Sequence, residues 1–423
     1  MHSPLTLPIL LRRLLPLSAS DMAMALGDPL VAIALARMTG PEITLAALGI
    51  IKALANFLES PIIMLLHAST ALSASRRSRQ ALWRFTLLAG SALTALFLVL
   101  TLPPVYRFVM GQLFSASPAV SQAGWAAMLV LGLWPGVIAW RRYFQGILIR
   151  EGRGRFLGLA SLARIGCLSA LLIVLGRAWP DGALVAASAI MGGLLAEAAL
   201  VTWWARQGSG ELPDAGPESL PTTLRTVGRY YFPLATTMVI VWGGRAVLVS
   251  ILARAVDGEL ALAAWAGGWG FVILLANSTR MVQQLVITHA RQAPPGLLVR
   301  LALTAGAVAT VLLVLLGFST PGRELMALLL GGGELVEPAL LMVRISCCLP
   351  LLVALQNTVQ GYCIVSGQNR RIQWASLAGT LVTLGVAAGI VFSGGSGLVA
   401  GAASVPVGVL VEILWLSPGR GRG

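Results

Sequence analysis

The chain has 423 residues, of which 57% are hydrophobic and only 11% are charged. Soluble domains carry about 25% charged residues, so this composition excludes an ordinary soluble protein and predicts an integral membrane protein. The formal net charge is +14, but the arginines stand between apolar runs rather than in one tail or patch, which argues against nucleic-acid binding.

The apolar runs predict an all-α polytopic membrane protein with twelve transmembrane helices, because runs of about 20 residues cross a hydrocarbon core. Six are expected at about 15–37, 43–71, 85–105, 120–148, 156–176 and 183–205. Six more are expected at about 229–255, 260–287, 298–318, 335–365, 372–392 and 396–416. The Gly-, Pro- and acid-rich break between the two sets predicts a flexible linker. The predicted domains are two six-helix halves, 1–206 and 227–423, joined by a linker at 207–226.

The two halves resemble each other. A shift of 215 positions pairs these residues: Pro135 with Pro350, Gln145 with Gln360, Gly152 with Gly367, Arg155 with Arg370, and Glu197 with Glu412. Near the N-terminus the shift is 217, and there Asp28 falls opposite Arg245. Duplicated halves in a membrane chain are typical of transporters that work by alternating access, with the site between the halves. Six helices per half make the two copies pseudo-symmetric and parallel.

One set of predicted loops carries most of the arginines, and the other set has almost none. The arginine-rich loops include Arg12-Arg13, Arg76-Arg77, Arg150, Arg206 and Arg370-Arg371. Loops rich in Arg and Lys stay on the cytoplasmic side. We therefore expect a multi-pass protein of a bacterial-type inner membrane with both termini and the linker in the cytoplasm.

Acidic residues inside the first predicted helix are candidates for ion coupling, because a charge at the bilayer centre costs at least ~2.5–3.5 kcal/mol. Asp28 lies near the middle of that helix, and Asp21 lies two turns earlier on the same face. Pro29 is expected to kink the helix and free carbonyl groups near Asp28. The site predicted here binds a proton or sodium; the alternative is a static salt bridge from Asp28 to Arg245. His67 is a further candidate relay, or else a packed polar residue.

Arg245 and Arg280 are the predicted anion-binding residues. Arginine keeps its proton, so each must face a carboxylate, an anionic substrate or water. Arg245 follows Trp242-Gly243-Gly244, where the glycines leave space beside the guanidinium. The other polar residues expected to line the substrate path are Asn56, Glu59, Asn277 and Gln284. An ion pair with Glu59 is the alternative role for Arg280.

The duplicated acids Glu197 and Glu412 are expected to serve as a structural hinge or to snorkel toward the membrane interface. Gly192-Gly193 is expected to permit close helix packing.

Recognisable catalytic and metal-binding spacings are missing from the sequence. The four cysteines show no CxxC spacing, the three histidines form no HExxH, and neither a GxSxG elbow nor a phosphate-binding GxxxxGK[ST] loop occurs. The sequence therefore predicts no enzyme, no metal site and no cofactor. Without an ATP site, the energy for transport would come from an ion gradient or from the solute's own gradient.

Several segments resemble a known family. They are PLSASDMAMALGDPLVAIALARM, LANFLESPI, QGILIREGRGRFLGLASL, MVRISCCLPLL and GAASVPVGVLVEI. With the two six-helix halves, they resemble the multidrug/oligosaccharidyl-lipid/polysaccharide (MOP) exporter superfamily, which has the MATE-like fold. Within it, they are most similar to the progressive ankylosis (ANK) family of pyrophosphate, nucleotide and citrate exporters.

The resemblance implies export of a small, multiply charged anion through a central cavity between the halves. Arg245 matches a family arginine in the seventh helix, and Glu412 matches a family glutamate in the twelfth. Asp28 stands where the family has an acid, whereas Glu197 stands where a base is usual. The expected partners are a small anionic solute, a proton or sodium, and membrane lipids, with the protein a monomer.

Two other functions stay open. A proton- or sodium-coupled multidrug antiporter would bind organic cations at Asp28, Asp21 and Glu59. A lipid-linked sugar flippase would instead have a cavity open sideways to lipid. Arginines without carboxylate partners favour an anion exporter, whereas arginines locked to Asp28 and Glu59 favour the antiporter.

Overall fold

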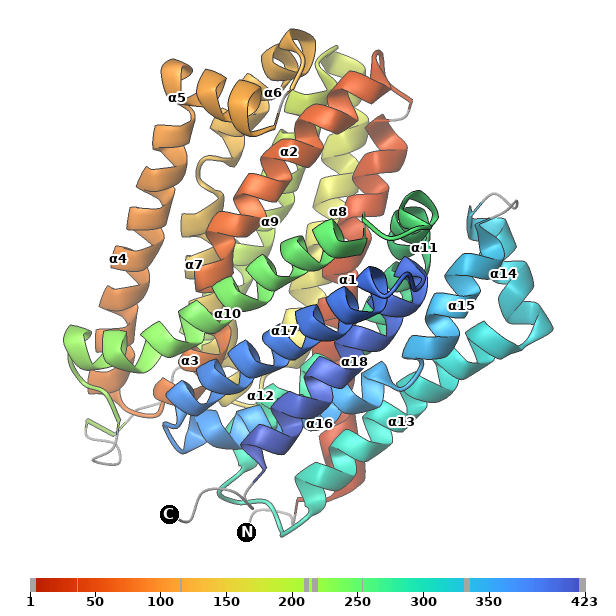
Figure 1. The fold of residues 1–423 in the computed structure, drawn as a ribbon. Coiled ribbons are helices and arrows are strands. Elements are labelled where there is room, and N and C mark those ends of the chain that lie inside the picture. The colour runs from red at the N-terminus through yellow and green to blue at the C-terminus, as the bar shows by residue number, and fades with distance from the viewer. Residues whose placement is uncertain are drawn as a thin grey trace. The chain divides into compact units, whose positions relative to one another are not determined.

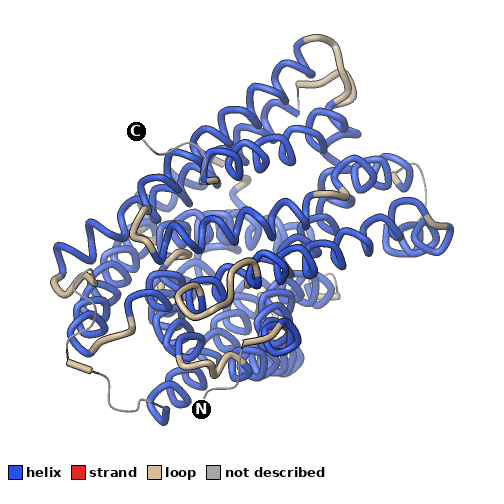
Figure 2. The backbone as a smooth tube through the Cα atoms, turned by 90° about the horizontal axis from the view of Figure 1, so that it is seen from below, coloured by secondary structure: helices blue, strands red, loops and turns tan. Residues whose placement is uncertain are grey.

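The structure of the chain is a computed structural model (Figure 1). It describes residues 5–35, 37–114, 116–208, 213–214, 220–252, 254–330 and 335–417, and the side chains of a few helical residues, Asp28 among them, lie outside the described part. Every regular element within these ranges is a helix, and short loops join consecutive helices (Figure 2).

The first six predicted spans correspond to the helices up to residue 208. These are α1 (Leu7–Leu35), α2 (Pro41–Glu59), η1 (Ser60–Ile62), α3 (Leu65–Leu72), α4 (Arg76–Leu100), α5 (Pro103–Phe108), η2 (Val109–Leu113), α6 (Pro118–Leu131), α7 (Trp134–Arg150), α8 (Arg155–Ala178) and α9 (Gly182–Gly208).

The last six predicted spans correspond to the remaining helices. These are α10 (Leu224–Leu252), α11 (Gly258–Arg280), α12 (Val282–His289), α13 (Leu297–Phe318), α14 (Thr320–Leu330), α15 (Val336–Ser346), α16 (Leu349–Val365), α17 (Asn369–Phe392) and α18 (Gly397–Leu416).

The predicted all-helical, multi-pass architecture is confirmed. Within the described residues, ten helical stretches are long and apolar enough to cross a membrane, or eleven if α15 and α16, bent by 41°, form one span. The helix α1, at the first predicted span, is not one of the ten, although its 29 residues are long enough for a crossing. The twelve-helix count therefore agrees approximately with the structure.

The helix breaks repeat between the two halves of the chain. Four spans consist of two helices, and the breaks fall at equivalent positions. Met64 precedes α3 and Met281 precedes α12, a shift of 217. Pro135 and Pro350, a shift of 215, lie in the first turns of α7 and α16. Proline has no amide hydrogen to donate, so it suits the start of a helix, and its repetition explains why both spans restart there.

The duplicated glycines Gly152 and Gly367 share one backbone conformation. Both lie in the turn before the next helix, before α8 and α17, and both have φ of 71°. Only glycine adopts this left-handed region without steric cost. The repetition of these two residues therefore has a local structural cause.

The contacts within the chain group it into two compact units. Unit 1 comprises Met1–Ser18 and Thr236–Gly423, and unit 2 comprises Ala19–Ala235. The boundaries lie inside α1 and α10 at positions equivalent by the shift of 217. Each of these helices thus has its first turns in one unit and its remainder in the other. The predicted halves and linker stay a prediction; residues 209–212 and 215–219 of that linker lie outside the described part.

Each unit contains one closely packed pair of helices, α8 with α9 in unit 2 and α17 with α18 in unit 1 (Figure 1). A Cβ atom at Gly193 would lie 2.9 Å from the Arg164 carbonyl oxygen. A Cβ atom at Gly408 would lie 2.6 Å from the Gly379 carbonyl oxygen. The second contact repeats the first, because the shift of 215 relates Gly193 to Gly408 and Arg164 to Gly379. The close packing predicted at Gly193 is confirmed, and it brings each following acid, four residues later, beside its neighbouring helix.

Candidate functional sites in the two units

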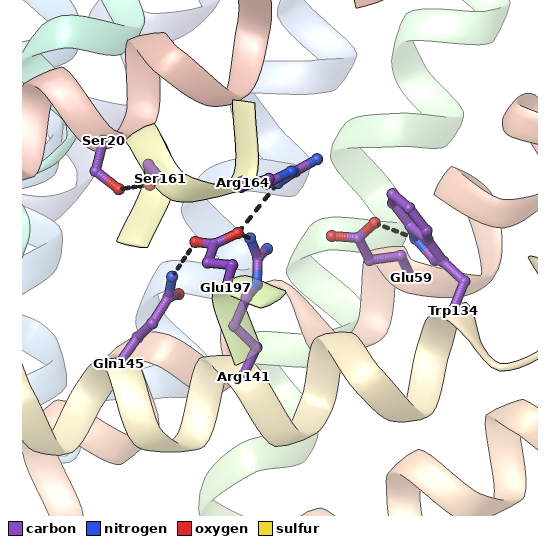
Figure 3. Close-up of polar contacts among 8 residues, drawn as sticks. All are labelled: Ser20, Glu59, Trp134, Arg141, Gln145, Ser161, Arg164 and Glu197. Atoms are coloured by element: carbon purple, nitrogen blue, oxygen red, sulfur yellow. Dashed lines mark hydrogen bonds and ion pairs between the residues drawn. The ribbon is translucent and has the colours of Figure 1, made fainter. Parts of the chain in front are cut away.

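Glu197 of α9 lies in a buried polar cluster of unit 2, together with Arg141, Gln145 and Arg164; we call these four residues the Glu197 cluster (Figure 3). Arg141 donates from Nη1 to Oε2 at 2.5 Å, and Arg164 donates to the same oxygen at 3.4 Å. Gln145 donates to Oε1 at 2.9 Å. Arg141 and Gln145 are one helical turn apart on α7, so both reach the same carboxylate.

The expectation that Glu197 snorkels toward the interface is wrong. Its side chain is 0% exposed, as is that of Arg141. Snorkelling places a charged group in water, but here two guanidinium groups balance the carboxylate inside the helix bundle. The Glu197 cluster is therefore an internal ion-pair network that joins α7, α8 and α9.

A second group of charges in unit 2 surrounds Arg142, which is buried. Glu59 and Asp21 lie near enough to attract its guanidinium electrostatically. Glu59 Oε2 also accepts a hydrogen bond of 2.8 Å from Trp134 Nε1 (Figure 3). Two buried atoms, Asp21 Oδ2 and Arg142 Nε, find no hydrogen-bond partner among the described residues. These two acids are thus already engaged electrostatically by a buried base.

Arg141, Arg142 and Arg164 were not among the predicted site residues. All three lie inside predicted spans, at 120–148 and 156–176. A base inside a membrane span is by default a functional or paired residue, and that rule, applied to all predicted spans, identifies these three residues too.

Glu412 of α18 lies in the equivalent cluster of unit 1, together with Gln356, Gln360 and Ser376; we call these four residues the Glu412 cluster. All three neighbours donate to Glu412 Oε2, at 2.6 Å from Gln356, 3.3 Å from Gln360 and 3.2 Å from Ser376. Glu412 is 6% exposed, so snorkelling is wrong for this residue too. No ion pair with Glu412 occurs within the described part of the chain.

Arg245 and Arg280, the predicted anion-binding residues, both belong to unit 1. Arg245 lies on α10, is exposed, and holds its guanidinium carbon 5.3 Å from the centre of the Trp242 ring. Arg280 is the half-buried last residue of α11. The two guanidinium groups are near enough to repel each other. Neither forms an ion pair with any residue that the structure describes, including Glu59.

The glycines before Arg245 differ in their surroundings. A Cβ atom at Gly243 would meet nothing within 4 Å, whereas one at Gly244 would press on Thr380 of α17. Gly243 therefore provides the expected open space, and Gly244 allows α10 to approach α17.

The other predicted site residues are placed individually. Asn277 is half-buried one turn before Arg280, and Asn56 is half-buried one turn before Glu59. Gln284 is 0% exposed and His67 is 7% exposed, so both are packed inside their units. The side chain of Asp28 lies outside the described residues, and its ion-binding role and its salt bridge to Arg245 stay predictions.

Neither a family model nor a curated protein matches the sequence. Solved structures match the fold over nearly the whole chain. A MATE transporter in complex with MaD3S is 14% identical, with a TM-score of 0.75, over 96% of this chain and 94% of that chain. An outward-facing multidrug-resistance MATE transporter of the MOP superfamily is 15% identical, with a TM-score of 0.72, over 96% and 93%. A MOP superfamily transporter from Pyrococcus furiosus, described as having a binding pocket of reverse polarity that suggests a different function, is 15% identical, with a TM-score of 0.73, over 96% and 93%. The chain is a multi-pass membrane protein with the fold of these MATE transporters of the MOP superfamily.

Proposed function

We propose that the protein exports small, multiply charged anions of the citrate, pyrophosphate or nucleotide class by alternating access. The observation that carries this proposal is the pair of mutually repelling arginines, Arg245 and Arg280, without a carboxylate partner among the described residues. The MATE fold, which is that of transporters, supports export as the activity.

The position of each arginine within its span explains why an anion is the expected ligand. Arg245 lies seven residues before the end of α10, and Arg280 lies nine residues before the end of the span that continues through α12. At such depth, a guanidinium facing hydrocarbon costs at least ~2.5–3.5 kcal/mol. Because arginine keeps its proton, a group that carries or accepts charge is needed beside Arg245, and an anionic substrate would supply it.

The closeness of the two arginines favours a ligand with more than one negative charge. Each guanidinium raises the electrostatic energy of the other, and a dianion or trianion bound to both would reverse that repulsion. Guanidinium groups bind carboxylate and phosphate oxygens with paired hydrogen bonds. Citrate, pyrophosphate and nucleotides all carry several such oxygens.

Two further observations agree with an anionic substrate. The ANK resemblance places a family arginine at Arg245, and that family exports anions of this class. The Pyrococcus furiosus transporter with the same fold is described as having a pocket of reverse polarity. Pockets of different polarity thus occur on this fold.

An organic-cation antiporter is the second candidate, and one observation favours it. The Oδ2 atom of Asp21 is buried without a hydrogen-bond partner in the described part of the chain, as an acid awaiting a cation would be. Arg142 attracts both Asp21 and Glu59, however. This attraction reduces the negative potential available to a cationic drug.

Efflux from proteoliposomes loaded in parallel with citrate, pyrophosphate, ATP and ethidium tests the proposal. We expect the wild type to release at least one of the anions in a saturable manner. Arg245→Ala and Arg280→Ala should each slow that efflux about 10- to 100-fold, because a hydrogen bond to a charged group contributes about 1.5–3 kcal/mol. Arg254→Ala is the matched control, because Arg254 is exposed and its one hydrogen bond to a described residue is to the Ser250 carbonyl oxygen. Wild-type anion efflux in both variants, or release of ethidium alone, contradicts the proposal.

A further inference from the structure

We propose that Glu412 is a proton-binding site of unit 1 and that its protonation is coupled to the anion site at Arg245 and Arg280. The coupling rests on the proposed export of anions, whereas the proton site itself stands on the geometry of the Glu412 cluster.

A residue-by-residue comparison of the two duplicated clusters shows where they differ. The shift of 215 relates Glu197 to Glu412 and Gln145 to Gln360, so the acid and one amide are kept. The same shift replaces Arg141 by Gln356 and Arg164 by Gly379. Both cations that neutralise Glu197 are therefore absent from the equivalent positions around Glu412. The two sites thus share the acid, but only the site in unit 2 has counter-charges at these positions.

The charge of a carboxylate at position 412 is not balanced by a cation among the described residues. Glu412 is 6% exposed, and its hydrogen-bond donors among the described residues are all neutral, two amides and one hydroxyl. A buried ionised group without a counter-ion is strongly unfavourable, and neutralisation by a proton is its usual resolution. Glu197, with two guanidinium groups, has no such need and stays ionised.

The geometry leaves one carboxyl oxygen available for the proton. The three neighbours donate to Oε2, so the acidic proton belongs on Oε1. That oxygen lies over Gly379, where a Cβ atom would be 2.9 Å from Oε1 and 2.5 Å from Cγ of Glu412. The absence of a side chain at Gly379 thus lets the Glu412 side chain lie directly against α17, at the position where Arg164 stands in unit 2.

The surroundings suit a proton better than a sodium ion. Sodium requires several oxygen ligands, whereas the neighbours of Glu412 present N–H and O–H donors to it. The amide oxygen of Gln360 accepts a hydrogen bond from Gln283 instead, at 3.4 Å. Within the described residues, no group of three or more His, Cys, Asp or Glu side chains forms a metal-binding cluster.

The charged and titratable groups on the helices packed against α18 do not neutralise Glu412. On α17, Arg371 donates to the carbonyl oxygens of Trp415 and Ser417, beyond Glu412. On α15, Arg344 bonds to Gly317 and pairs with Glu337. The remaining described groups make no hydrogen bond or ion pair with Glu412. They are Arg280 on α11, Cys347 and Cys348 between α15 and α16, Tyr362 and Cys363 on α16, and Arg370 on α17. The side chain of Glu259 on α11 lies outside the described residues.

Two physical connections join the Glu412 cluster to the anion site within unit 1. The first is a chain of amides: Gln360 bonds to Glu412 and to Gln283, which lies one turn after Arg280. The second is a packing contact, because Gly379 lies against Glu412 and the next residue, Thr380, lies against Gly244 beside Arg245. Through these two connections, a change in the charge or position of Glu412 would be transmitted toward both arginines.

Infrared difference spectroscopy of the purified, solute-free protein tests the proton site. Titration of the wild type should reveal a carboxylic-acid C=O band that Glu412→Gln abolishes. Gln356→Arg should abolish it as well, although the carboxyl group is still present, because it restores the cation that Arg141 supplies to Glu197. Gln360→Arg serves the same purpose if Gln356→Arg does not fold. Glu337→Gln, which alters a half-exposed acid already paired with Arg323 and Arg344, is the matched control and should leave the band unchanged.

Anion efflux measured over the same pH series tests the coupling. Wild-type efflux should change by up to about tenfold per pH unit on the side of the Glu412 titration where the required protonation state is the minor one. This dependence should vanish in Glu412→Gln but not in Glu337→Gln. A band that survives Glu412→Gln overturns the proton site, whether or not an anion is exported. A lost band with unaltered pH dependence of efflux overturns only the coupling and leaves anion export standing.

Discussion

Arg141 and Glu197 form an ion pair of 2.5 Å between α7 and α9 in which neither side chain is exposed. The pair is the centre of a network, because Gln145 and Arg164 bind the same carboxylate. The network holds three helices of unit 2 together, whereas its counterpart around Glu412 contains no ion pair within the described residues.

Removal of Glu197 should strongly destabilise the protein. Glu197→Ala leaves Arg141 buried without its counter-charge, and breaking a buried pair on one side costs about 3–5 kcal/mol. The free energy of unfolding in detergent micelles measures this loss. The double variant Glu197→Gln with Arg141→Gln, which removes both charges of the pair together, should recover part of it. Unfolding of Glu197→Ala at the wild-type midpoint would show that the pair is not formed.

Replacing Gly152 or Gly367, the glycines of the two equivalent turns, should lower the free energy of unfolding by the same amount. Gly152→Ala and Gly367→Ala each force a Cβ atom into a backbone with φ of 71°, which costs about 1–2 kcal/mol for an L-residue. Gly385→Ala on α17 is the control, because its Cβ atom would meet nothing within 4 Å, and alanine suits a helix better than glycine by about 1 kcal/mol. The midpoint temperature of thermal unfolding should therefore fall for Gly152→Ala and Gly367→Ala and not for Gly385→Ala. Equal changes in all three variants would show that the left-handed backbone conformation does not set the cost.

The stability of unit 1 should depend on pH through Asp257, which lies in the loop before α11. Burial opposes its ionisation, but hydrogen bonds from the Ser396 hydroxyl (2.5 Å) and the Gly397 amide (2.6 Å) outweigh this effect and hold the pKa of Asp257 below its usual value. A lowered pKa means that the ionised form stabilises the fold. This stabilisation is complete above about pH 4, the pKa expected in the unfolded chain, and is lost as the pH falls through the lowered value.

Asp257→Asn should remove that acid-side dependence and about 1 kcal/mol of stability at neutral pH, because it weakens the cap of α18. Unfolding midpoints between pH 3 and pH 7 provide the measurement. Asp214→Asn is the control, since Asp214 is 79% exposed and pairs with Arg76 at only 3.9 Å. An Asp257→Asn curve parallel to that of the wild type would contradict the assignment.

The sequence predicts the fold well for identifiable reasons. Apolar length predicted twelve spans, in approximate agreement with the ten or eleven stretches found among the described residues. The repeat anticipated equivalent backbone features at Gly152 and Gly367, because a left-handed turn needs glycine wherever it occurs. Helix breaks inside spans were not predicted, since a break before Pro135 does not change hydropathy. Patterns along the chain thus specify spans and turns, while breaks depend on local proline placement.

The candidate sites are predicted less completely. Arg245 and Arg280 were identified as unusual bases, and the structure brings them near each other in one unit. The partners of Glu197 were not predicted, because a salt bridge between α7, α8 and α9 depends on which helix faces meet. Their repeat positions alone, however, show that Arg141 and Arg164 have no basic counterparts in the second half.

The close contact at Gly408 should couple helix packing to the Glu412 cluster. A Cβ atom there would overlap the Thr383 hydroxyl and lie 2.6 Å from the Gly379 carbonyl oxygen. Thr383 can rotate away, but the carbonyl belongs to the backbone of α17, so Gly408→Ala must move α18 and its Glu412, at a cost of about 1–3 kcal/mol. Adding Thr383→Ala relieves only the side-chain overlap and should restore a minor part of the stability. Full recovery in the double variant would show that the side chain, not the backbone contact, sets the distance between α17 and α18.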